Sequence, residues 1–336
     1  MTNMRTRPIL IVDGNSALVR SHFALAGSNL RTSSGTPVWA IKGMWNLITA
    51  AINRVDAAGV LLTFDSGRTF RSERYPQYKA GRAEKDADLR TQIAAAPTHF
   101  RNAGLPVAAI DGYEADDLLA AAAHTYTHGQ QRVVLLTSDR DSFALITDTC
   151  AEHADTRVLR MINGGAYNWP LLTPSRLHSM YGVYPHEYRL YAAIRGDSSD
   201  NLPGVTGIGE KTATKLVAYL RATQISFDTA LADLDAGGSI LSDAIGSAAA
   251  RKFSNPQSRV NLARNRDLMT PVDTLPVPDL DTVTTGINRE AFLTETRAWE
   301  LTIPETIVAP AQHTTPAITP PRIPQPVTEP ALTLFS

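Results

Sequence analysis

The stretch "DGYEADDLLAAAAH", residues 111–124, places three carboxylates within four residues, directly before an apolar segment with helical spacing. They are Glu114, Asp116 and Asp117. One acid is favourable in the first turn of a helix, because the unpaired N–H groups and the helix dipole attract negative charge there. Three carboxylates exceed that need, so we looked for other acids with which they could share a cation site.

More acids stand where apolar runs of strand length end. Asp13 ends "PILIVD", Asp65 ends "VLLTFD", and Asp139 and Asp141 end "VVLLTSDRD". Segments with helical spacing lie between these runs. Short apolar strands that alternate with helices predict an α/β fold with a mostly parallel sheet buried on both faces. In such sheets ligands bind beyond the carboxyl ends of the strands, so we expect the acids to converge there.

The acids would repel one another if they converged. Two like charges 4 Å apart repel by about 4 kcal/mol at an effective dielectric of 20, so the group needs cations. Carboxylates without thiolate or histidine partners suit Mg²⁺ or Mn²⁺. Two such ions roughly 4 Å apart can generate hydroxide and stabilise the leaving oxygen of a phosphodiester. Each acid taken alone is explained by capping a helix, but independent caps have no reason to recur after every strand.

A basic segment follows Asp65. It reads "RTFRSERYPQYKAGRAEK", residues 68–85, in which arginine and lysine are interleaved with Phe70, Tyr75 and Tyr78. Such a run is usually a solvated loop. The aromatic residues favour a surface that binds phosphates and stacks on bases. Its position after Asp65 would hold it over the acids.

Composition limits the class of protein. The 336 residues are 43% hydrophobic with a net charge of −1 and one cysteine, Cys150. A chain of this length can bury one large core or two smaller ones. The single cysteine excludes internal disulfides and thiolate zinc sites. We find no apolar run long enough for a membrane span or a signal peptide, which predicts a soluble cytoplasmic protein with no membrane partner.

The pattern divides the chain into three parts. Residues 1–196 are predicted to form an α/β core, residues 197–303 a helical subdomain, and residues 304–336 a flexible proline-rich tail. "GVTGIGEKTA", residues 204–213, differs from a phosphate-binding Walker loop because Lys211 follows glutamate. A glycine hairpin between helices that approaches a phosphate fits better, and a plain helix connection is the alternative. His124 and His128 are interpreted as helix-end residues.

Together the motifs "LIVDGNS", "TFDSGRTFRSERYPQYKAGR", "GYEADD", "TSDRD" and "GDSSDNLPGVTGIGEKTA" resemble the 5′ nuclease family. This family includes the 5′-to-3′ exonuclease domain of bacterial DNA polymerase I, phage 5′ exonucleases and flap endonucleases. The similarity runs from about residue 8 to 300. It implies a PIN-like α/β nuclease core at residues 1–196 with a helical arch at about 67–90, a C-terminal helix-hairpin-helix subdomain, and two-metal cleavage near 5′ ends or flaps.

The resemblance also implies roles for individual residues. The family's metal carboxylates fall on Asp13, Asp65, Glu114, Asp116, Asp117, Asp139, Asp141, Asp197 and Asp200. Its catalytic arch-base cations fall on Lys79 and Arg82. Contacts with DNA are expected from Arg68, Arg71, Arg74, Tyr78, Gly207, Gly209, Lys211 and Lys215, with Tyr78 stacking on a base. The hairpin belongs to an element that can hold K⁺ in this family.

The last residues, "EPALTLFS", resemble the bacterial sliding-clamp-binding peptide. Leu332, Leu334 and Phe335 match its apolar positions, and Glu329 stands where glutamine is expected. A chance apolar C-terminus is the alternative, so clamp docking is a hypothesis.

We therefore expect a stand-alone, monomeric 5′-to-3′ exonuclease and flap endonuclease of replication or repair. Its expected substrates are DNA with 5′ flaps, nicks or ends, and RNA primers. The alternatives are a non-catalytic DNA-structure-binding protein and a PIN-like ribonuclease. Binding alone gains nothing from concentrating negative charge beside a phosphate backbone, which disfavours the first alternative.

Overall fold

The computed structural model describes residues 7–307, and its centre is a six-stranded sheet. The strands are β1 (Ile9–Asp13), β2 (Gly59–Thr63), β3 (Val107–Ala108), β4 (Val133–Thr137), β5 (Thr156–Arg160) and β6 (Leu171–Leu172). Their spatial order is β3-β2-β1-β4-β5-β6, and all neighbours are parallel except β5 and β6. The sheet is thus mostly parallel, as expected for buried apolar strands joined by helices.

Fourteen α-helices are present in the described residues. The first seven are α1 (Gly14–Leu25), α2 (Trp39–Val55), α3 (Phe70–Arg74), α4 (Ala87–Asn102), α5 (Ala115–His128), α6 (Pro174–Tyr181) and α7 (Pro185–Arg195). The others are α8 (Glu210–Thr223), α9 (Phe227–Asp235), α10 (Ile240–Ile245), α11 (Ser247–Ala250), α12 (Pro256–Leu268), α13 (Leu280–Thr284) and α14 (Arg289–Ala298). A hairpin of β7 (Gly196–Asp197) and β8 (Leu202–Pro203) follows α7. Short 3₁₀ helices are η1 (Ala26–Ser28), η2 (Asp141–Leu145), η3 (Ala166–Asn168), η4 (Arg251–Ser254) and η5 (Glu305–Ile307).

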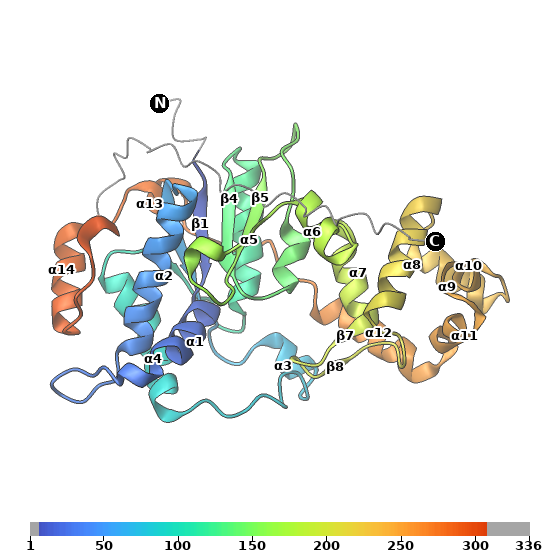
Figure 1. The fold of residues 1–336 in the computed structure, drawn as a ribbon, viewed down its shortest axis with the longest axis horizontal. Coiled ribbons are helices and arrows are strands. Elements are labelled where there is room, and N and C mark those ends of the chain that lie inside the picture. The colour runs from blue at the N-terminus through green and yellow to red at the C-terminus, as the bar shows by residue number, and fades with distance from the viewer. Residues whose placement is uncertain (1–6, 308–336) are drawn as a thin grey trace, which may run out of the picture.

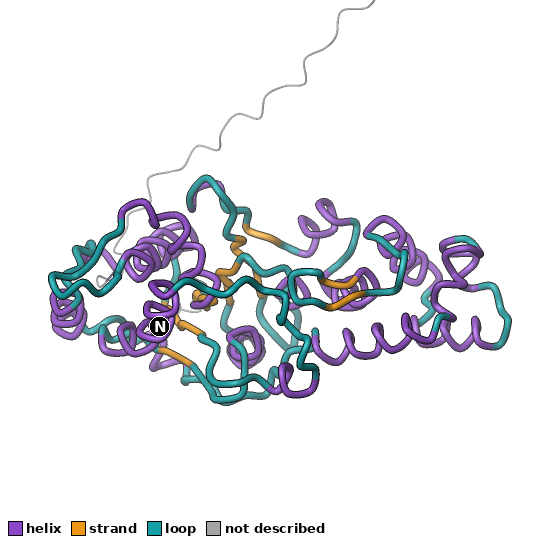
Figure 2. The backbone as a smooth tube through the Cα atoms, turned by 90° about the horizontal axis from the view of Figure 1, so that it is seen from below, coloured by secondary structure: helices purple, strands orange, loops and turns teal. Residues whose placement is uncertain are grey.

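The molecule is elongated, with the α/β core at one end and helices α8 to α12 at the other (Figure 1). Seen from below, the strands lie between helices on both sides (Figure 2). None of the helices in residues 7–307 is long and apolar enough to cross a membrane.

Alternate residues of β1 pack on opposite faces of the sheet. Ile9 and Ile11 lie in one apolar cluster with Leu118 of α5, whereas Leu10 and Val12 belong to the other cluster. All five side chains are fully buried. Burial of each such side chain stabilises the fold by roughly 1.5–3 kcal/mol. Because both faces are buried, the strands read as continuous apolar runs that end where the polar sheet edge begins.

The segment after α12 packs against the α/β core, although it lies within residues 197–303, for which a helical subdomain is predicted. The chain returns to the α/β core after α12, and the carbonyl of Val283 lies so close to Gly59 of β2 that a Cβ there would approach it within 2.4 Å. Phe292 of α14, Ile303 and Ile307 are buried in the cluster that contains Leu10. Ile307, in the first residues of the predicted tail, is therefore part of the core, and its 3₁₀ helix η5 packs against α2.

The predicted arch at 67–90 is only partly helical. Helix α3 has five residues, residues 75–86 form turns and loop, and Asp86 caps α4 by accepting a hydrogen bond from the Leu89 N–H at 2.7 Å. Figure 1 shows this loop running along one edge of the molecule between α3 and α4. Pro76 disfavours helical geometry at Tyr75, which explains why α3 ends there.

A buried histidine ties α14 to the core. Trp45 Nε1 donates to His99 Nε2 at 2.9 Å, and His99 Nδ1 lies 3.0 Å from Glu295 Oε1. The Trp45 bond requires an unprotonated Nε2. Burial lowers the pKa of His99 from 6.5 to about 4. The folded state therefore favours the neutral ring, even with a carboxylate beside it.

We expect this histidine to make the fold less stable in acid. The unfolded chain binds a proton at His99 near pH 6.5, and the folded chain binds it only near pH 4. The contribution of His99 to the free energy of unfolding is therefore complete above pH 6.5 and is lost as the pH falls to 4. The loss is on the order of 3 kcal/mol. In His99→Gln, which keeps an acceptor for Trp45, the free energy of unfolding should depend less on pH across this window. Urea unfolding of both proteins from pH 8 to 4 measures the difference, and equal pH slopes would contradict the assignment.

Candidate active site

Four neighbouring strands end at one edge of the sheet, and each is followed by acids. Asp13 is the last residue of β1, Asp65 stands two residues after β2, and Asp139 stands two residues after β4. Asp116 lies in the first turn of α5, which follows β3. Because β3, β2, β1 and β4 are consecutive in the sheet, their carboxyl ends bring these acids together.

Asp13 and Asp65 are oriented by groups of the core. Asp13 accepts hydrogen bonds from the Ser16 N–H at 2.9 Å and from Thr137 Oγ1 at 2.8 Å. Asp65 accepts from Asn15 Nδ2 at 2.6 Å and from the Ala115 N–H at 2.7 Å. These donors fix both carboxylates without neutralising their charge.

Asp116 lies among like charges. Burial raises its pKa well above 3.8, and the nearby carboxylates of Asp139, Asp13 and Asp65 raise it further. Its Oδ1 atom is buried and has no hydrogen-bond partner within the described part of the chain. A buried carboxylate oxygen without a donor is rare, and it suits a cation that the protein alone does not supply.

The acids after β4 and in the β7–β8 hairpin extend the cluster. Burial raises the pKa of Asp141 to about 8, with further contributions from Asp139, Asp197 and Asp200. Burial likewise raises the pKa of Asp139 and takes that of Asp13 to about 7. The carboxylates therefore resist joint ionisation, which is the behaviour expected of a site that binds divalent cations.

The acids do not form a finished coordination shell. Among residues 7–307, no three His, Cys, Asp or Glu side chains are arranged to hold one metal ion. Glu114 and Asp200 are instead bound to cationic side chains of the arch base. An incoming ion would therefore exchange with these side chains.

Lys79 and Arg82 supply those cations. Lys79 Nζ donates to Glu114 Oε1 at 2.8 Å, and Arg82 Nη2 donates to Asp200 Oδ1 at 2.5 Å. Burial alone would lower the pKa of Lys79, but Glu114 and Asp200 outweigh it and raise this pKa, so the amine stays charged. Both cations line a cavity of about 950 Å³ that also exposes Asp116. A phosphate in this cavity would meet the cations and the acids together.

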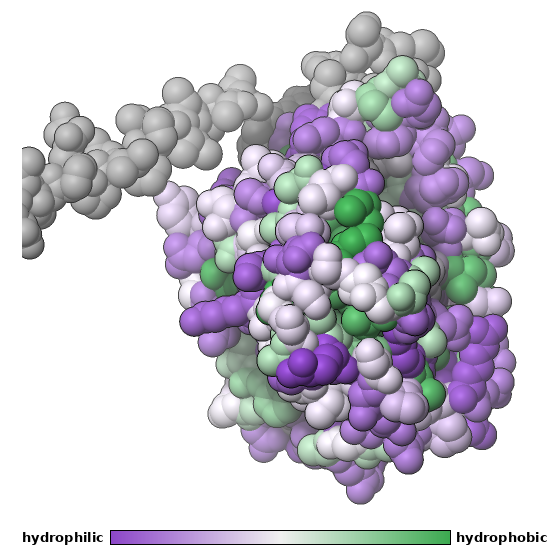
Figure 3. Space-filling view, turned by 90° about the vertical axis from the view of Figure 1, so that its right-hand side faces the viewer, coloured by the Kyte–Doolittle hydropathy of each residue, from purple (hydrophilic) through white to green (hydrophobic). Residues whose placement is uncertain are grey.

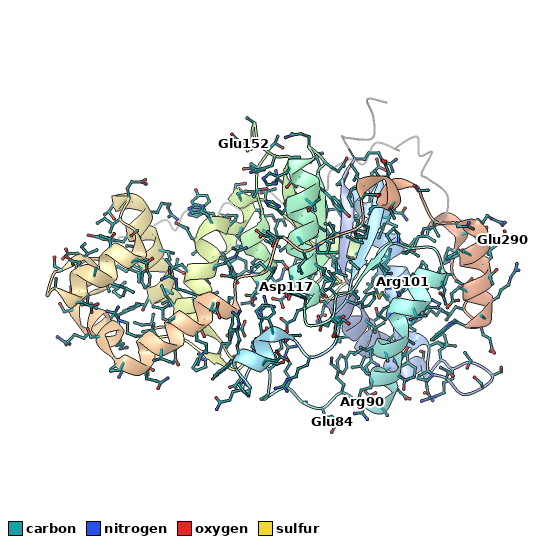
Figure 4. The ribbon with its side chains drawn as sticks, turned by 180° about the vertical axis from the view of Figure 1, so that it is seen from behind. Glu84, Arg90, Arg101, Asp117, Glu152 and Glu290 are labelled. Carbon is teal, nitrogen blue, oxygen red and sulfur yellow. The ribbon has the colours of Figure 1, made fainter. Side chains whose placement is uncertain are left out.

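Asp117 has a different role from the predicted one. Its carboxylate accepts two hydrogen bonds from Arg71, at 2.6 and 2.7 Å, and also the N–H groups of Glu114 and Val272. The side chain is fully buried in the interior beside the start of α5 (Figure 4). With its oxygens occupied, Asp117 is not a metal ligand in this arrangement. It caps α5 and neutralises a buried arginine.

Arg71 and Tyr78 also depart from their predicted contacts with DNA. Arg71 is 3% exposed and donates to the carbonyls of Leu268 and Thr270 as well as to Asp117. Tyr78 is 8% exposed, and its hydroxyl donates to Glu114 Oε2 at 3.1 Å. Neither side chain is available to a strand on the surface. They are buried because the arch base packs against α5 and the segment after α12.

The other predicted contacts with DNA lie on the surface. Arg68 and Arg74 are exposed, and Arg74 pairs with exposed Asp267 at 3.2 Å. Gly207 has a φ of +77°, which opens the hairpin before α8, and Gly209 is the N-cap of α8. Lys211 and Lys215 are exposed on α8. Figure 3 shows the face at this end of the molecule, where hydrophilic residues surround a central area that also contains hydrophobic ones.

A lysine side chain of the protein already binds a backbone carbonyl of the hairpin. Lys252 Nζ donates to the Gly207 carbonyl at 2.6 Å. An ammonium group therefore occupies one of the carbonyls through which the hairpin could hold K⁺. A K⁺ ion that used the Gly207 carbonyl would have to displace the Lys252 ammonium group.

The rings of His124 and His128 lie with their centroids 4.1 Å apart, tilted by 40°, at the exposed end of α5. His128 Nδ1 interacts with the His124 carbonyl at 2.8 Å. Both lie in the C-terminal part of α5, which ends at His128.

Sequence reasoning missed several residues that hold or line the site. Asn15 and Thr137 orient the acids, and Ser16 and Ser138 bond to each other beside them, with their Oγ atoms 2.5 Å apart. The stretches "DGNS" and "LLTSD" could have indicated these residues, because small polar residues stand beside an acid in each. Hydrogen-bonding residues next to a charged group at a strand end indicate that the group is held in place.

The raised pKa values predict that divalent ions stabilise the fold in a pH-dependent way. The pKa values of Asp13 and Asp141 are about 7 and about 8 in the folded chain, against an ordinary value of 3.8. Their contribution to the free energy of unfolding is therefore complete below pH 3.8 and is lost as the pH rises to 8. Mg²⁺ at 100 times its Kd would restore about 2.7 kcal/mol, a shift in Tm of roughly 5 °C. The shift should be large at pH 8 and small at pH 5.

Thermal unfolding with Mg²⁺ or with EDTA measures this shift. NaCl at the same ionic strength is the control for screening. An equal shift at both pH values, or the same shift with NaCl, would show that Mg²⁺ does not act through these carboxylates.

Two family models match the chain. Residues 8–169 match "5'-3' exonuclease, N-terminal resolvase-like domain", and residues 183–285 match "5'-3' exonuclease, C-terminal SAM fold". Together the matches cover most of the sheet, the arch, the acids and the hairpin.

Curated relatives are bacterial DNA polymerases. The chain is 33% identical over 278 residues to DNA polymerase I of Mycobacterium bovis, which covers 81% of this chain and 28% of that protein. It is 38% identical over 210 residues to the thermostable DNA polymerase I of Thermus aquaticus, covering 62% of this chain and 23% of that protein. The chain therefore spans about a quarter of the length of these relatives.

Solved structures share the fold. A T5 5′-exonuclease with bound zinc has a TM-score of 0.57 at 21% identity, and the match covers 88% of this chain and 98% of that one. A T5 flap endonuclease in a pseudo-enzyme-product complex with DNA and metal ions has a TM-score of 0.58 at 21% identity, with the same coverage. At this identity the likeness shows the fold alone.

Proposed function

Because the chain belongs to the 5′-3′ exonuclease family, we propose that it hydrolyses phosphodiester bonds of DNA at 5′ ends and 5′ flaps. The observation that supports this proposal most is the buried, mutually repelling acids that share a cavity with Lys79 and Arg82. Such an array is unfavourable for an isolated fold and suits cations and a phosphate.

We propose that the cations are two Mg²⁺ or Mn²⁺ ions. The residues that would hold them are Asp13, Asp65, Glu114, Asp116, Asp139, Asp141, Asp197 and Asp200. When bound, such ions supply a hydroxide nucleophile at neutral pH and stabilise the charge on the leaving oxygen. The donor set fits, since it offers only oxygen ligands and one buried oxygen of Asp116 has no partner among residues 7–307. Asp117 is not included, because Arg71 already binds it.

Lys79 and Arg82 would bind the reacting phosphate. To do so they must leave Glu114 and Asp200, which become free for cations at the same moment. The phosphate would replace Glu114 as the partner of Lys79 and Asp200 as the partner of Arg82. Binding of the phosphate and release of the two carboxylates to the metal ions would therefore favour each other. The protein would thus complete its metal site only when a strand lies beneath the arch.

The remaining roles follow from family membership and the surface. Exposed Arg68, Arg74, Lys211 and Lys215 would bind backbone phosphates, and the hairpin at Gly207 would follow the duplex, with or without K⁺. We propose a cytoplasmic monomer that removes flaps or RNA primers in replication or repair.

Docking of a sliding clamp would use Leu332, Leu334 and Phe335, which lie outside the described residues. A pull-down that survives deletion of residues 332–336 would exclude this use of the tail.

A cleavage assay with labelled substrates tests the proposal. We expect 5′-labelled flap, nicked and RNA-primed duplexes to be cut with Mg²⁺ and not with EDTA, and single-stranded RNA to be cut poorly. Asp139→Asn should abolish the cleavage. If this variant cut the flap at the wild-type rate, the assignment would be wrong. Tight binding without cleavage would favour a DNA-structure-binding protein, and preferred cleavage of single-stranded RNA would favour a ribonuclease.

A further inference from the structure

A second cavity adjoins the acids beside the β7–β8 hairpin, whose Ser199 carbonyl accepts a hydrogen bond from Arg82 of the arch base. It has a volume of about 650 Å³ and lies between the loop after β4 and the β7–β8 hairpin. Arg140, Arg195, Asp197, Ser198 and Ser199 are among its lining residues. It shares Ser138 and Asp139 with the larger cavity, so the two cavities meet at the acids.

Two arginines of this cavity form no close ion pair among residues 7–307, although Arg195 interacts at longer range with Asp197 and Asp141. Arg195, the last residue of α7, donates from Nε to the Gly196 carbonyl at 3.1 Å, and its guanidinium lies 5.2 Å from the Tyr191 ring centroid. Arg140 is exposed and lies 5.9 Å from the Tyr181 ring centroid. Within residues 7–307 neither forms an ion pair, although twelve other arginines do. The nearby Asp197 carboxylate is bound by Ser199 instead.

The backbone holds Arg195 rigidly at the cavity wall. Gly196 has a φ of +80°, and a Cβ on it would lie 2.3 Å from the Gly204 nitrogen. A Cβ on Gly204 would lie 2.3 Å from the Ile194 carbonyl oxygen. The two glycines allow the strands of the hairpin to meet closely, so the base of the Arg195 side chain is fixed. A preorganised arginine loses little entropy when it binds an anion.

The two cavities and the hairpin mark a continuous path. The larger cavity lies beneath the arch, the acids lie where the cavities meet, and Gly204 at the rim of the smaller cavity leads to the duplex-binding hairpin at Gly207. A strand whose reacting phosphate lies at the acids and whose duplex lies at the hairpin must cross the smaller cavity. Arg195 and Arg140 are the cations it would meet there.

We infer that Arg195, with Arg140, binds a phosphodiester of the cleaved strand on the duplex side of the scissile bond. This inference rests on the proposed function, because it needs a strand at the acids. The guanidinium presents a planar fork of donors that matches phosphate oxygens. The contact positions the reacting phosphate and takes no part in the chemical step, so Arg195 is a positioning residue.

Charge removal on the DNA tests the contact. A 5′-flap duplex is prepared with one phosphodiester at a time replaced by an uncharged methylphosphonate, and its Kd is measured with Ca²⁺ while the labelled strand remains intact. We expect wild-type protein to lose affinity roughly tenfold at one linkage on the duplex side. Arg195→Gln should bind unmodified DNA roughly tenfold more weakly and lose nothing further at that linkage.

Salt dependence gives a second readout that a purely structural role would not change. Loss of one phosphate contact should reduce the slope of log K against log salt by about 0.9. Arg54→Gln is the matched control, because Arg54 is an exposed arginine in the last turn of α2, at the opposite edge of the sheet. It should leave both the slope and the methylphosphonate profile unchanged. Arg195→Lys should recover part of the affinity, since it keeps the charge.

The outcomes separate the inference from the proposed function. If Arg195→Gln still loses affinity at every linkage to which wild-type protein responds, Arg195 contacts no phosphate and the inference is wrong. If wild-type protein responds to no linkage and cuts no flap, the proposed function fails instead. If Arg195→Gln does not fold, Arg140→Gln replaces it in the same measurements, because the Arg140 side chain is exposed.

Discussion

Asp116→Asn is expected to reduce Mg²⁺-dependent cleavage of a 5′ flap by about 10³-fold while leaving the metal-free protein at least as stable as the wild type. The loss corresponds to about 4 kcal/mol of transition-state stabilisation, within the several kcal/mol that a metal site supplies. Asp116 lies among like charges, since Asp139, Asp13 and Asp65 all raise its pKa in addition to burial. An amide cannot replace the charge that attracts a divalent ion.

The thermal stability of Asp116→Asn distinguishes a metal ligand from a structural residue. Removal of a catalytic residue often leaves the fold unchanged, but here a buried charge that repels its neighbours disappears. At pH 8 with EDTA we therefore expect an unchanged or higher Tm. With Mg²⁺ the rise in Tm should be smaller than in the wild type, because one ligand is missing.

Asp111→Asn is the matched control. Asp111 lies in the turn before α5, five residues earlier in the chain, and is exposed. It should retain cleavage and the Mg²⁺-induced rise in Tm. If Asp116→Asn lost its activity together with several degrees of metal-free Tm, the carboxylate would be a structural residue and its assignment to the metal site would be wrong.

Arg71→Met is expected to destabilise the protein by about 3–5 kcal/mol, even though Arg71 lies in the segment whose sequence suggests contacts with DNA. The substitution leaves the Asp117 carboxylate buried and without its bidentate partner. It also leaves the carbonyls of Leu268 and Thr270 without their donors. These contacts join the arch base, the start of α5 and the segment after α12, so cleavage should fall as the arch base loosens.

A pair of variants separates the buried charge from other causes. Arg71→Met combined with Asp117→Leu removes both charges and should recover much of the lost stability, because burying an unpaired charge is the main penalty. Arg74→Met is the control. Arg74 lies on the same helix and pairs with Asp267, but the two side chains are 61% and 58% exposed. Its loss should change the free energy of unfolding by less than about 1 kcal/mol.

Urea unfolding and flap binding at several salt concentrations decide between the two roles of Arg71. A structural arginine changes the free energy of unfolding and leaves the salt slope of DNA binding unchanged. A DNA contact does the opposite. A stable Arg71→Met protein with a reduced salt slope would restore the interpretation suggested by the sequence.

The sequence determined the fold class and the position of the acidic cluster. Apolar runs such as "ILIVD" and "VVLLT" are long enough only for buried strands, and the helical segments between them require parallel neighbours. Because parallel strands end at a common edge, Asp13, Asp65 and Asp139 had to meet in space once the strands were recognised. This inference needs only the chain order and the chemistry of each residue.

Only the tertiary structure decided which charges face each other. Glu114, Asp116 and Asp117 look equivalent in the sequence, yet one binds Lys79, one faces the other acids and one binds Arg71. Successive residues of a helix start point about 100° apart, so their partners depend on which elements pack around α5. The arch base and the segment after α12 come from residues about 40 before and 150 after this helix. A pattern read along the chain contains no information about such contacts, and this is why the sequence located the site but not the partner of each charge.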